Sequence, residues 1–512
     1  MPVNTLTQAL EHGKGISKDG PAIVIPENGP SFKFSALQHL VADFQAQLAE
    51  IGVGHGDAIS MALPNGLEFT VAFFGSCAQR CISAPLNPAY KKSEYEFYID
   101  DLKSKVVLVP RGFVEKNDAS VQAAKEYSAA VAEVYWDGKH VQVDLKIPSK
   151  SLKRTQVQQA QADDIGLVVH TSGTTGRPKA VPLSQKNLTR TMGNIVRTYA
   201  LNPQDRTLLV MPLFHVHGLL CALLGSLLSG ASVVIPSKFS AQTFWRDFTE
   251  HQCNWYTAVP TIHQILLRTP VPSPRPKIRF IRSCSSALAP STMAKIEETF
   301  DAPVLEAYAM SEAAHQMTSN PLPPASRKPG SVGIGQGVRV TILDAGGDEV
   351  PIGQEGEISI MGENVTAGYL NNERANKEAF TARGWFRTGD QGKLDSQGYV
   401  FITGRIKELI NRGGEKISPI ELDGALVSHP KVAEAVAFGV PSDMYGQEVA
   451  CAIVVAAGQQ LTEEEVKSYM TDRVARFKVP KVVYFTDAIP KMGSGKVSRK
   501  VVADKFEPKA KL

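Results

Sequence analysis

The sequence predicts an α/β protein with a mostly parallel sheet, followed by a β-rich segment and a small α+β domain. Three observations support this fold class. Apolar runs alternate with helical segments up to residue 307, and this alternation is typical of parallel α/β layers. From about residue 330, glycine turns separate short strands. The last stretch, about a hundred residues, is long enough for a small domain of its own.

The first part of the chain alternates strands and helices. We expect strands at 58–63, 82–86 and 106–109. An apolar helix is expected at 67–80 and an amphipathic helix at 93–102. This order predicts parallel strands in one sheet.

The alternation continues to residue 307. Further strands are expected at 165–169, 207–210, 232–235, 279–282 and 304–307. Helices are expected at 184–199, with Ser184 as N-cap, and at 219–228. Residues 146–163 are rich in Lys, Ser and Gln, which predicts a surface connection.

The β-rich segment and the final domain meet at a predicted hinge. Apolar and charged residues alternate around 405–410 between glycines, a composition that suits a domain boundary. We therefore divide the chain into residues 1–404 and 405–512. The strands expected on either side of this boundary are 338–343, 356–360, 399–403, 432–440, 449–455 and 482–485, with a helix at 462–473.

Composition excludes several classes of protein. The chain has 512 residues, 43% hydrophobic and 21% charged, as in ordinary soluble globular proteins. A net charge of +4 argues against a nucleic-acid or anionic-membrane partner. There is no apolar run of the ~18–20 residues that a membrane span needs, and no signal-peptide pattern at the N-terminus. Six cysteines without a Cys-x-x-Cys pair predict buried free thiols and no structural zinc.

A candidate phosphate-binding loop follows the strand at 165–169. Hydroxyls, backbone N–H groups and a lysine suit phosphate oxygens, and glycine lets the backbone approach closely. The loop is not a Walker A motif, because Lys179 is followed by Ala180. The alternative is a flexible Ser/Gly surface turn. The residues concerned are Thr171, Ser172, Gly173, Thr174, Thr175, Gly176 and Lys179.

Three further segments follow predicted strands, where ligands of open α/β sheets bind. The first contains His215 and His217, whose alternative is two ordinary polar loop residues. The second is a small-residue loop at 283–290. The third contains Glu312, a carboxylate that could hold a hard cation such as Mg²⁺. The alternative for Glu312 is a surface glutamate that caps a helix.

Charged residues of interest also lie in the β-rich segment and near the C-terminus. Asp390 is predicted at a tight turn within 384–390, and Arg405 opens the hinge segment. Lys496 lies among glycine-rich turn residues. The alternative for Lys496 is a solvated charge on a mobile loop.

Together and in this order, these segments resemble the acyl-adenylate-forming superfamily of acyl-CoA synthetases, peptide-synthetase adenylation domains and firefly luciferase. The matching segments are 171–179, 214–218, 285–287, 308–312, 388–390, 404–407 and 493–496. The chain is similar in particular to the plant and fungal oxalyl-CoA synthetases, at 212–218, 255–264, 306–310 and 408–419. The resemblance implies a large N-terminal adenylation domain of several subdomains and a small mobile C-terminal domain.

The resemblance also implies a reaction in two steps. A carboxylate attacks the α-phosphate of Mg-ATP, giving acyl-adenylate and pyrophosphate, and the thiol of coenzyme A then displaces AMP. Because a carboxylate is ionised at neutral pH, the first step needs positioning and charge stabilisation rather than a general base.

Site residues follow from the same resemblance. Glu312 is expected to bind Mg²⁺, Lys496 to reach the α-phosphate, and Tyr308 to stack on adenine. Asp390 and Arg405 are expected to hold the ribose hydroxyls. The residues assigned to ATP are the loop residues Thr171 to Gly176, Lys179, Ser286, Ala287, Glu306, Ala307, Tyr308, Ser311, Asp390 and Arg405.

The second step is expected to involve the small domain. Lys407 matches the hinge about which that domain turns, and His215 matches the gate between the acyl pocket and the thiol entry. We count Lys496, Glu312 and His215 as the catalytic residues. The residues assigned to coenzyme A are Arg412, Gly413, Gly414 and Lys416.

The acyl pocket is expected to take a small polar acid. Ala309 stands where many relatives have glycine and would shorten the pocket, and Ser285 and Ser286 add hydrogen-bond donors. His315, one helical turn past 310–311, is expected to face the same pocket. We hypothesise that His215, Ser286 and His315 contact the second carboxylate of oxalate. The alternative is that these residues are neutral packing variants.

Other readings of the superfamily pattern remain. They are a CoA ligase for another short-chain, medium-chain or aromatic carboxylate, and a non-catalytic nucleotide-binding relative. A peptide-synthetase adenylation domain would need a carrier domain, and none follows Lys496; a luciferase-like side activity stays open. The tripeptide Ala510-Lys511-Leu512 resembles the Ser-Lys-Leu peroxisomal address. It predicts a peroxisomal import receptor as partner, with a basic tail and the cytoplasm as the alternative.

Overall fold

The computed structural model describes residues 3–13, 15–171, 177–491 and 497–506. Its first sheet has seven strands in the order β7-β6-β5-β3-β4-β8-β9. The five strands from β6 to β8 run parallel, whereas β7 and β9 are antiparallel edge strands. The strands are β3 (Ala58–Met61), β4 (Ile82–Pro85), β5 (Val106–Pro110), β6 (Ala130–Trp136), β7 (Val141–Ile147), β8 (Ile165–Thr171) and β9 (Lys179–Ser184).

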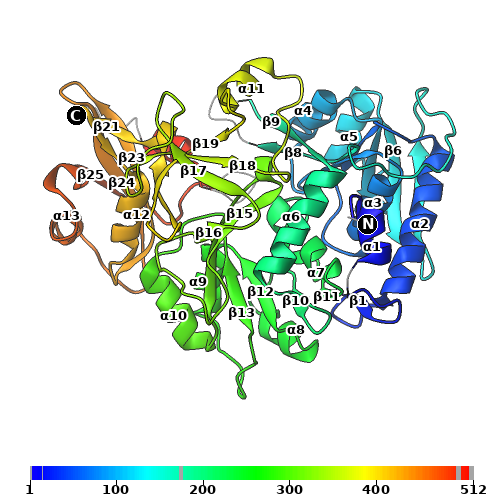
Figure 1. The fold of residues 1–512 in the computed structure, drawn as a ribbon, viewed down its shortest axis with the longest axis horizontal. Helices are drawn as coiled ribbons and strands as arrows, with labels where there is room; N and C mark the ends of the chain where they lie inside the picture. Colours follow the sequence, from blue (N-terminus) through cyan, green and yellow to red (C-terminus); the bar gives the residue numbers. More distant parts are fainter. Residues whose placement is uncertain (1–2, 14, 172–176, 492–496, 507–512) are drawn as a thin grey trace.

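Helices cover both faces of this sheet (Figure 1). Because side chains alternate along a strand, Leu108 of β5 packs in the core with α2 and α3, whereas Val107 packs with α4 and α5. Burial on both faces explains why the strands are almost uniformly apolar. The helices are α2 (Phe34–Ile51), α3 (Leu67–Ala78), α4 (Lys92–Leu102) and α5 (Ala119–Glu126).

The second sheet has nine strands in the order β16-β15-β14-β13-β12-β10-β11-β1-β2. The strands from β14 to β1 run parallel, and β2, β15 and β16 are antiparallel additions at the two edges. The strands are β1 (Pro21–Val24), β2 (Ser31–Lys33), β10 (Arg206–Leu208), β11 (Ser232–Val234), β12 (Trp255–Ala258), β13 (Phe280–Ser283), β14 (Val304–Met310), β15 (His315–Ser319) and β16 (Ile334–Gly335).

The helix α6 and the π-helix η1 join the two sheets. Leu188 of α6 and Leu219 of η1 share one core with Leu167 of the first sheet and Val233 of the second. α8 and α10 cover the opposite face of the second sheet. The remaining helices of this part are α1 (Leu6–His12), α6 (Gln185–Thr198), η1 (His217–Leu224), α7 (Gly225–Leu227), α8 (Phe244–Glu250), α9 (Pro260–Leu266) and α10 (Pro290–Phe300).

An antiparallel four-stranded sheet follows, and a five-stranded sheet with its own cores ends the chain (Figure 1). The first consists of β17 (Arg339–Leu343), β18 (Gly356–Met361), β19 (Phe386–Leu394) and β20 (Val400–Arg405), near α11 (Glu373–Ala379). The second consists of β21 (Ile410–Arg412), β22 (Glu415–Ile417), β23 (Val432–Ser442), β24 (Gly446–Val455) and β25 (Val482–Phe485). Its helices are α12 (Pro419–Val427), α13 (Glu463–Thr471) and α14 (Arg499–Phe506).

The predicted α/β class is confirmed, and most expected elements are present. Ser184 caps α6 as predicted, by accepting a hydrogen bond from the Asn187 N–H. The sequence predicts Asp390 at a tight turn, but the residue lies within β19. The helix expected at 219–228 begins at His217 and is mostly π-helical. The domain boundary between residues 404 and 405 stays a prediction.

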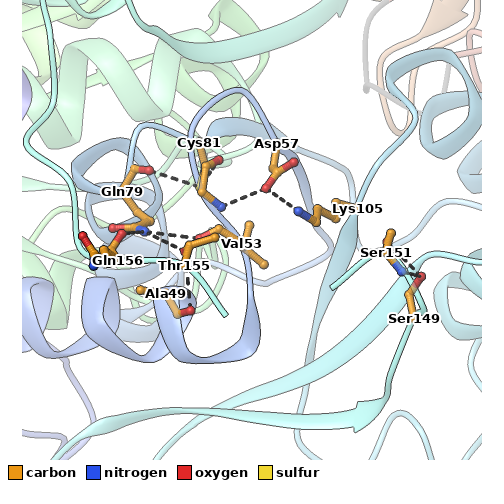
Figure 2. A network of polar contacts seen from close by, with 11 residues as sticks. Ala49, Val53, Asp57, Gln79, Cys81, Lys105, Ser149, Ser151, Thr155 and Gln156 are labelled. Atoms are coloured by element: carbon orange, nitrogen blue, oxygen red, sulfur yellow. Dashed lines mark hydrogen bonds and ion pairs between the residues drawn. The ribbon is translucent and has the colours of Figure 1, made fainter. Parts of the chain in front are cut away.

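The surface connection after β7 is fastened to the ends of α2 and α3 (Figure 2). The Thr155 N–H donates to the Ala49 carbonyl at 2.9 Å, and Gln79 Nε2 donates to the Gln156 carbonyl at 2.9 Å. Gly52 ends α2 with φ +92°, and a Cβ there would meet the Lys153 backbone at 2.6 Å. The polar connection therefore packs against the C-terminal ends of α2 and α3.

Two composition-based expectations concern burial. All six cysteines are buried and unpaired, as predicted. Within the described ranges, none of the helices combines the length and the apolar character that a bilayer crossing would require.

Candidate active site

Segments that follow strands of both sheets meet at Glu312. It lies in the 3₁₀ turn η2 (Ser311–Ala313) directly after β14, which belongs to the second sheet. Thr171 ends β8 of the first sheet, and its Oγ1 lies 3.5 Å from Glu312 Oε1. Lys179 on β9 is paired with Thr171 in the ladder. Two groups predicted from distant segments are therefore neighbours.

Glu312 is a buried carboxylate, with 6% of its surface exposed. The Tyr369 hydroxyl donates to Glu312 Oε1 at 2.9 Å, and Lys179 Nζ lies 4.5 Å from the centre of the Tyr369 ring. Burial raises the pKa of Glu312, against the opposing effects of the Tyr369 hydrogen bond and of the Lys179 and Arg405 charges. A further cation beside Glu312 would stabilise its charge. The burial of Glu312 rules out the alternative that it is a surface glutamate capping a helix.

Tyr308, Asp390 and Arg405 form a second group, from β14, β19 and β20. Asp390 and Arg405 are cross-strand partners, and Arg405 Nε donates to Asp390 Oδ1 at 2.9 Å. The Tyr308 hydroxyl donates to Asp390 Oδ2. Burial and the Asp390 charge raise the pKa of Tyr308, so its hydroxyl stays a neutral donor. The ring and the carboxylate are thereby fixed relative to each other.

Glu306 anchors the small-residue loop at 283–290 to β14. Its Oε1 accepts a hydrogen bond from the Leu288 N–H at 2.9 Å. Only 4% of Glu306 is exposed, and burial raises its pKa to about 7. Its Oε2 is buried without a hydrogen-bond partner among the described residues. Ser286 and Ala287 lie exposed on the anchored loop.

Other predicted nucleotide residues lie nearby. Ala307 is buried in β14, and Ser311 is half-buried at the start of η2. The Ser286 hydroxyl donates to the Ser285 carbonyl at 2.9 Å. Ser172, Gly173, Thr174, Thr175, Gly176 and Lys496 lie outside the described residues, as does the tripeptide Ala510-Lys511-Leu512.

His217 is the centre of a buried polar cluster that the sequence did not indicate. Its Nδ1 lies 3.1 Å from Ser285 Oγ and its Nε2 lies 2.6 Å from Thr257 Oγ1. The His315 ring stacks on it, with centres 5.3 Å apart. His215, by contrast, is half-buried and packs against the Phe214 ring at 4.8 Å. His217 is therefore buried, whereas His215 is only half-buried.

The placement of His315 one helical turn after 310–311 is wrong. The chain turns back through Ala314, with φ +46°, and His315, with φ +87°, into β15. His315 is therefore the ladder partner of Met310, and Ala309 is the partner of Gln316. His315 still lies beside the strand end, but it is reached by a hairpin instead of a helix.

The residues predicted for the second step lie in the C-terminal part. Arg412 is ion-paired with Glu448 and lies 4.0 Å from the centre of the Tyr445 ring. Gly413 and Gly414 have φ of +57° and +95°, which explains glycine at both positions. Lys407 in η3 (Ile406–Glu408) and Lys416 on β22 are exposed.

Comparison with known proteins identifies the family. The AMP-binding enzyme family matches residues 14–370, and its C-terminal domain matches residues 421–496. The chain belongs to the AMP-binding enzymes. The oxalate–CoA ligase of Saccharomyces cerevisiae is 48% identical, over 98% of this chain and 97% of its own length. The oxalate–CoA ligase of Arabidopsis thaliana is 46% identical over 90% of both proteins.

Solved structures support the same fold. ATP-bound MatB from Rhodopseudomonas palustris matches with a TM-score of 0.88 and 28% identity, over 98% of this chain and 99% of that one. In the present protein, Asp390 and Arg405 lie between the two ranges that the family matches, 14–370 and 421–496. The hydrogen bond from Tyr308 to Asp390 connects them to the first of these ranges.

Proposed function

We propose that the protein is an AMP-forming acid–CoA ligase that converts oxalate, ATP and coenzyme A into oxalyl-CoA, AMP and pyrophosphate. The observation that carries this proposal is the similarity, over nearly the whole chain, to two oxalate–CoA ligases. The arrangement of Glu312 directly after β14, with Tyr308 inside β14 and Asp390 inside β19, supports it, since these groups suit a metal–nucleotide complex.

In the first step, one oxalate oxygen attacks the α-phosphorus and the bond to pyrophosphate breaks. Oxalate arrives ionised, so the protein positions the reactants and stabilises charge. Asp390 accepts the ribose hydroxyls while Tyr308 stacks on adenine, and Glu306 faces the base edge. The loop from Thr171 with Lys179 grips the β- and γ-phosphates. Lys496 neutralises charge at the α-phosphate.

Glu312 fits a magnesium site. It is a single buried carboxylate whose pKa is raised by burial, and the described residues contain no cluster of three or more potential metal ligands. Mg²⁺ characteristically takes one or two carboxylates and completes its shell with water and phosphate oxygens. When bound, it supplies positive charge that offsets the charge of the phosphates.

In the second step, the thiol sulfur of coenzyme A attacks the acyl carbon, AMP leaves and the thiol proton passes to solvent. We assign the hinge to Lys407 and the gate to His215. Gly413 and Gly414 line the CoA path with Arg412 and Lys416. The Glu448 and Tyr445 contacts of Arg412 hold its guanidinium in one place, which suits a fixed contact with a CoA phosphate.

We further propose that the protein reaches the peroxisome through its C-terminal tripeptide. Ala510-Lys511-Leu512 resembles the Ser-Lys-Leu address read by the peroxisomal import receptor. A fusion that masks this tripeptide should leave the protein in the cytoplasm, and peroxisomal import of the masked protein would contradict the proposal.

A pyrophosphate-release assay tests the substrate. The purified protein is given ATP, Mg²⁺ and coenzyme A with oxalate, malonate, acetate or 4-coumarate, and kcat/KM is expected to be highest for oxalate. A higher value for any of the other acids would make the protein a CoA ligase for that acid. ATP–pyrophosphate exchange with and without oxalate separates the ligase from a non-catalytic nucleotide-binding relative, which would show none.

A further inference from the structure

Arg282 on β13 is a fully buried guanidinium with neutral hydrogen-bond partners. Its Nε donates to the Tyr199 hydroxyl at 2.6 Å, and its Nη1 donates to Thr257 Oγ1 at 3.2 Å. Its Nη2 lies 3.4 Å from Gln316 Oε1. Within the described part of the chain, no carboxylate pairs with it. Because arginine stays charged and a buried charge without an opposite charge is unfavourable, an anion nearby would stabilise Arg282.

The guanidinium sets the direction of a chain of hydrogen bonds. His217 Nε2 has two polar neighbours. Thr257 Oγ1 lies 2.6 Å from it and Arg282 Nη1 lies 3.4 Å from it. A guanidinium has only donors, so a proton on Nε2 would face another donor. Nε2 therefore accepts from the Thr257 hydroxyl, and Nδ1 carries the ring proton. His217 then donates to Ser285 Oγ, at 3.1 Å.

This relay of Arg282, Thr257, His217 and Ser285 runs from the interior to the surface. The first three residues are buried, and Ser285 is half-buried in the loop after β13. Every proton in the relay points outward, so the Ser285 hydroxyl is left to donate onward. A row of donors with a positive charge at its inner end favours a negative group at its outer end. Ser285 lies beside β14, because Ser283 pairs with Glu306.

The backbone of Ser285 supports a functional role for its hydroxyl. Its φ is +74°, in the left-handed region that disfavours residues other than glycine. A glycine would relieve this strain but would lack the hydroxyl. Non-glycine residues held in such conformations are concentrated at functional sites.

We propose that Arg282 is a positioning residue for the acyl substrate, which orients the relay so that Ser285 donates a hydrogen bond to the second carboxylate of a small dicarboxylate. This inference rests on the proposed function and deepens it. The substrate's second negative charge compensates the buried guanidinium, although Arg282 does not touch it. The relay thereby favours a dianionic acid over a monocarboxylate of similar size.

Replacing Ser285 with glycine removes the hydroxyl and leaves the backbone conformation unstrained, so the contribution of the hydroxyl is measured alone. Ser285→Gly should raise the KM for oxalate about 10–100-fold, the loss expected for a hydrogen bond to a charged group, and leave the KM for ATP unchanged. Its Tm should stay level or rise by about 1–2 °C. The control is Asp301→Gly at the exposed end of α10, where φ is +52°. It should leave both KM values unchanged.

The role of Arg282 is tested by measuring whether its substitution and that of Ser285 have non-additive effects on the KM for oxalate. Arg282→Gln should raise the KM for oxalate as Ser285→Gly does, and the double variant should show little further increase, because both changes interrupt one relay. If Arg282→Gln does not fold, Thr257→Val takes its place in the cycle. The proposal would be wrong if the increases in the KM for oxalate of the two single variants multiplied in the double variant. It would also be wrong if Ser285→Gly left the KM for oxalate unchanged. A wild-type protein without oxalate turnover would instead contradict the proposed function.

Discussion

Asp390 on β19 and Arg405 on β20 are directly opposed in an antiparallel ladder, and their side chains form an ion pair at 2.9 Å. The Asp390 side chain is 9% exposed, whereas that of Arg405 is 51% exposed. The carboxylate is therefore held from one side by Arg405 and from the other by Tyr308. Its position is fixed before any nucleotide binds.

Asp390→Asn should weaken nucleotide binding more than it weakens the fold. The amide keeps the shape but loses the charge that accepts the ribose hydroxyls, so we expect the Kd for ATP to rise about 10-fold, as for the loss of a charge-assisted hydrogen bond. The exposed half of the ion pair contributes little to stability, about 0–1 kcal/mol. Isothermal titration with ATP measures the change.

Asp395→Asn is the matched control, because Asp395 pairs with Lys328 near the other end of β19. Its Kd for ATP should equal that of the wild type. An equal loss in both variants would indicate damage to the sheet rather than to the nucleotide site.

Glu306 should make the stability of the fold depend on pH. Its pKa is about 7 in the folded state, raised by burial from a usual value of 4.5. Below pH 4.5 Glu306 is protonated in both the folded and the unfolded state, so it does not change the free energy of unfolding. Between pH 4.5 and about pH 7 the folded state keeps a proton that the unfolded state has lost. Stability from this group therefore falls as pH rises, by about 3 kcal/mol in total above pH 7.

Glu306→Gln removes this dependence. The variant should gain Tm relative to the wild type as the pH is raised from 5 to 8, measured by differential scanning fluorimetry at each pH. Glu298→Gln on the exposed side of α10 is the control and should follow the wild type. A constant Tm difference between Glu306→Gln and wild type across that range would contradict the burial of a titrating carboxyl.

Tyr369→Phe should shift the pH dependence of adenylation. The hydroxyl of Tyr369 lowers the pKa of Glu312, while its ring lies under Lys179. Phenylalanine keeps the ring and removes the hydrogen bond, so the pKa of Glu312 rises further. The acidic limb of the pH profile of kcat/KM for ATP should move to higher pH, because Glu312 must be ionised to hold a cation. An unmoved limb would show that another group controls it.

The sequence predicts the layers well because most buried strands are short, mainly apolar runs, although β13 carries Arg282 and β14 carries Glu306. It also predicts that Thr171 and Glu312 lie beyond strand ends; Glu312 does follow β14, whereas Thr171 is the last residue of β8. It does not indicate Tyr369, because the contact with Glu312 joins residues 57 positions apart. Nor does it indicate the β14–β15 hairpin. Ala314 and His315 take positive φ without a glycine, so the turn leaves no local signal.

The sequence also does not indicate the π-helix or the cluster around His217. The apolar run after His217 is equally compatible with an α-helix, so nothing in the sequence distinguishes the wider turn. His217 and Ser285 are 68 residues apart, and only the folded sheet brings them within 3.1 Å. Long-range polar contacts of this kind have no periodicity that a single sequence could reveal.

Lys496→Ala should separate nucleotide binding from chemistry. The charge that develops at the α-phosphate during attack would lose its cation, whereas the contacts of adenine and ribose would remain. Interactions made mainly in the transition state change kcat rather than affinity, so we expect the rate of adenylation to fall about 100-fold or more. The Kd for ATP should stay within about threefold of the wild type.

Lys491→Ala is the control for this variant, because Lys491 lies in the same segment and pairs with Glu434 at 3.3 Å. Single-turnover formation of acyl-adenylate from oxalate and radiolabelled ATP is measured for both variants, with the Kd for ATP determined in parallel. Lys491→Ala should retain the wild-type rate. Adenylation at the wild-type rate in Lys496→Ala would assign the α-phosphate to another cation, and Lys179 would be the next residue to replace.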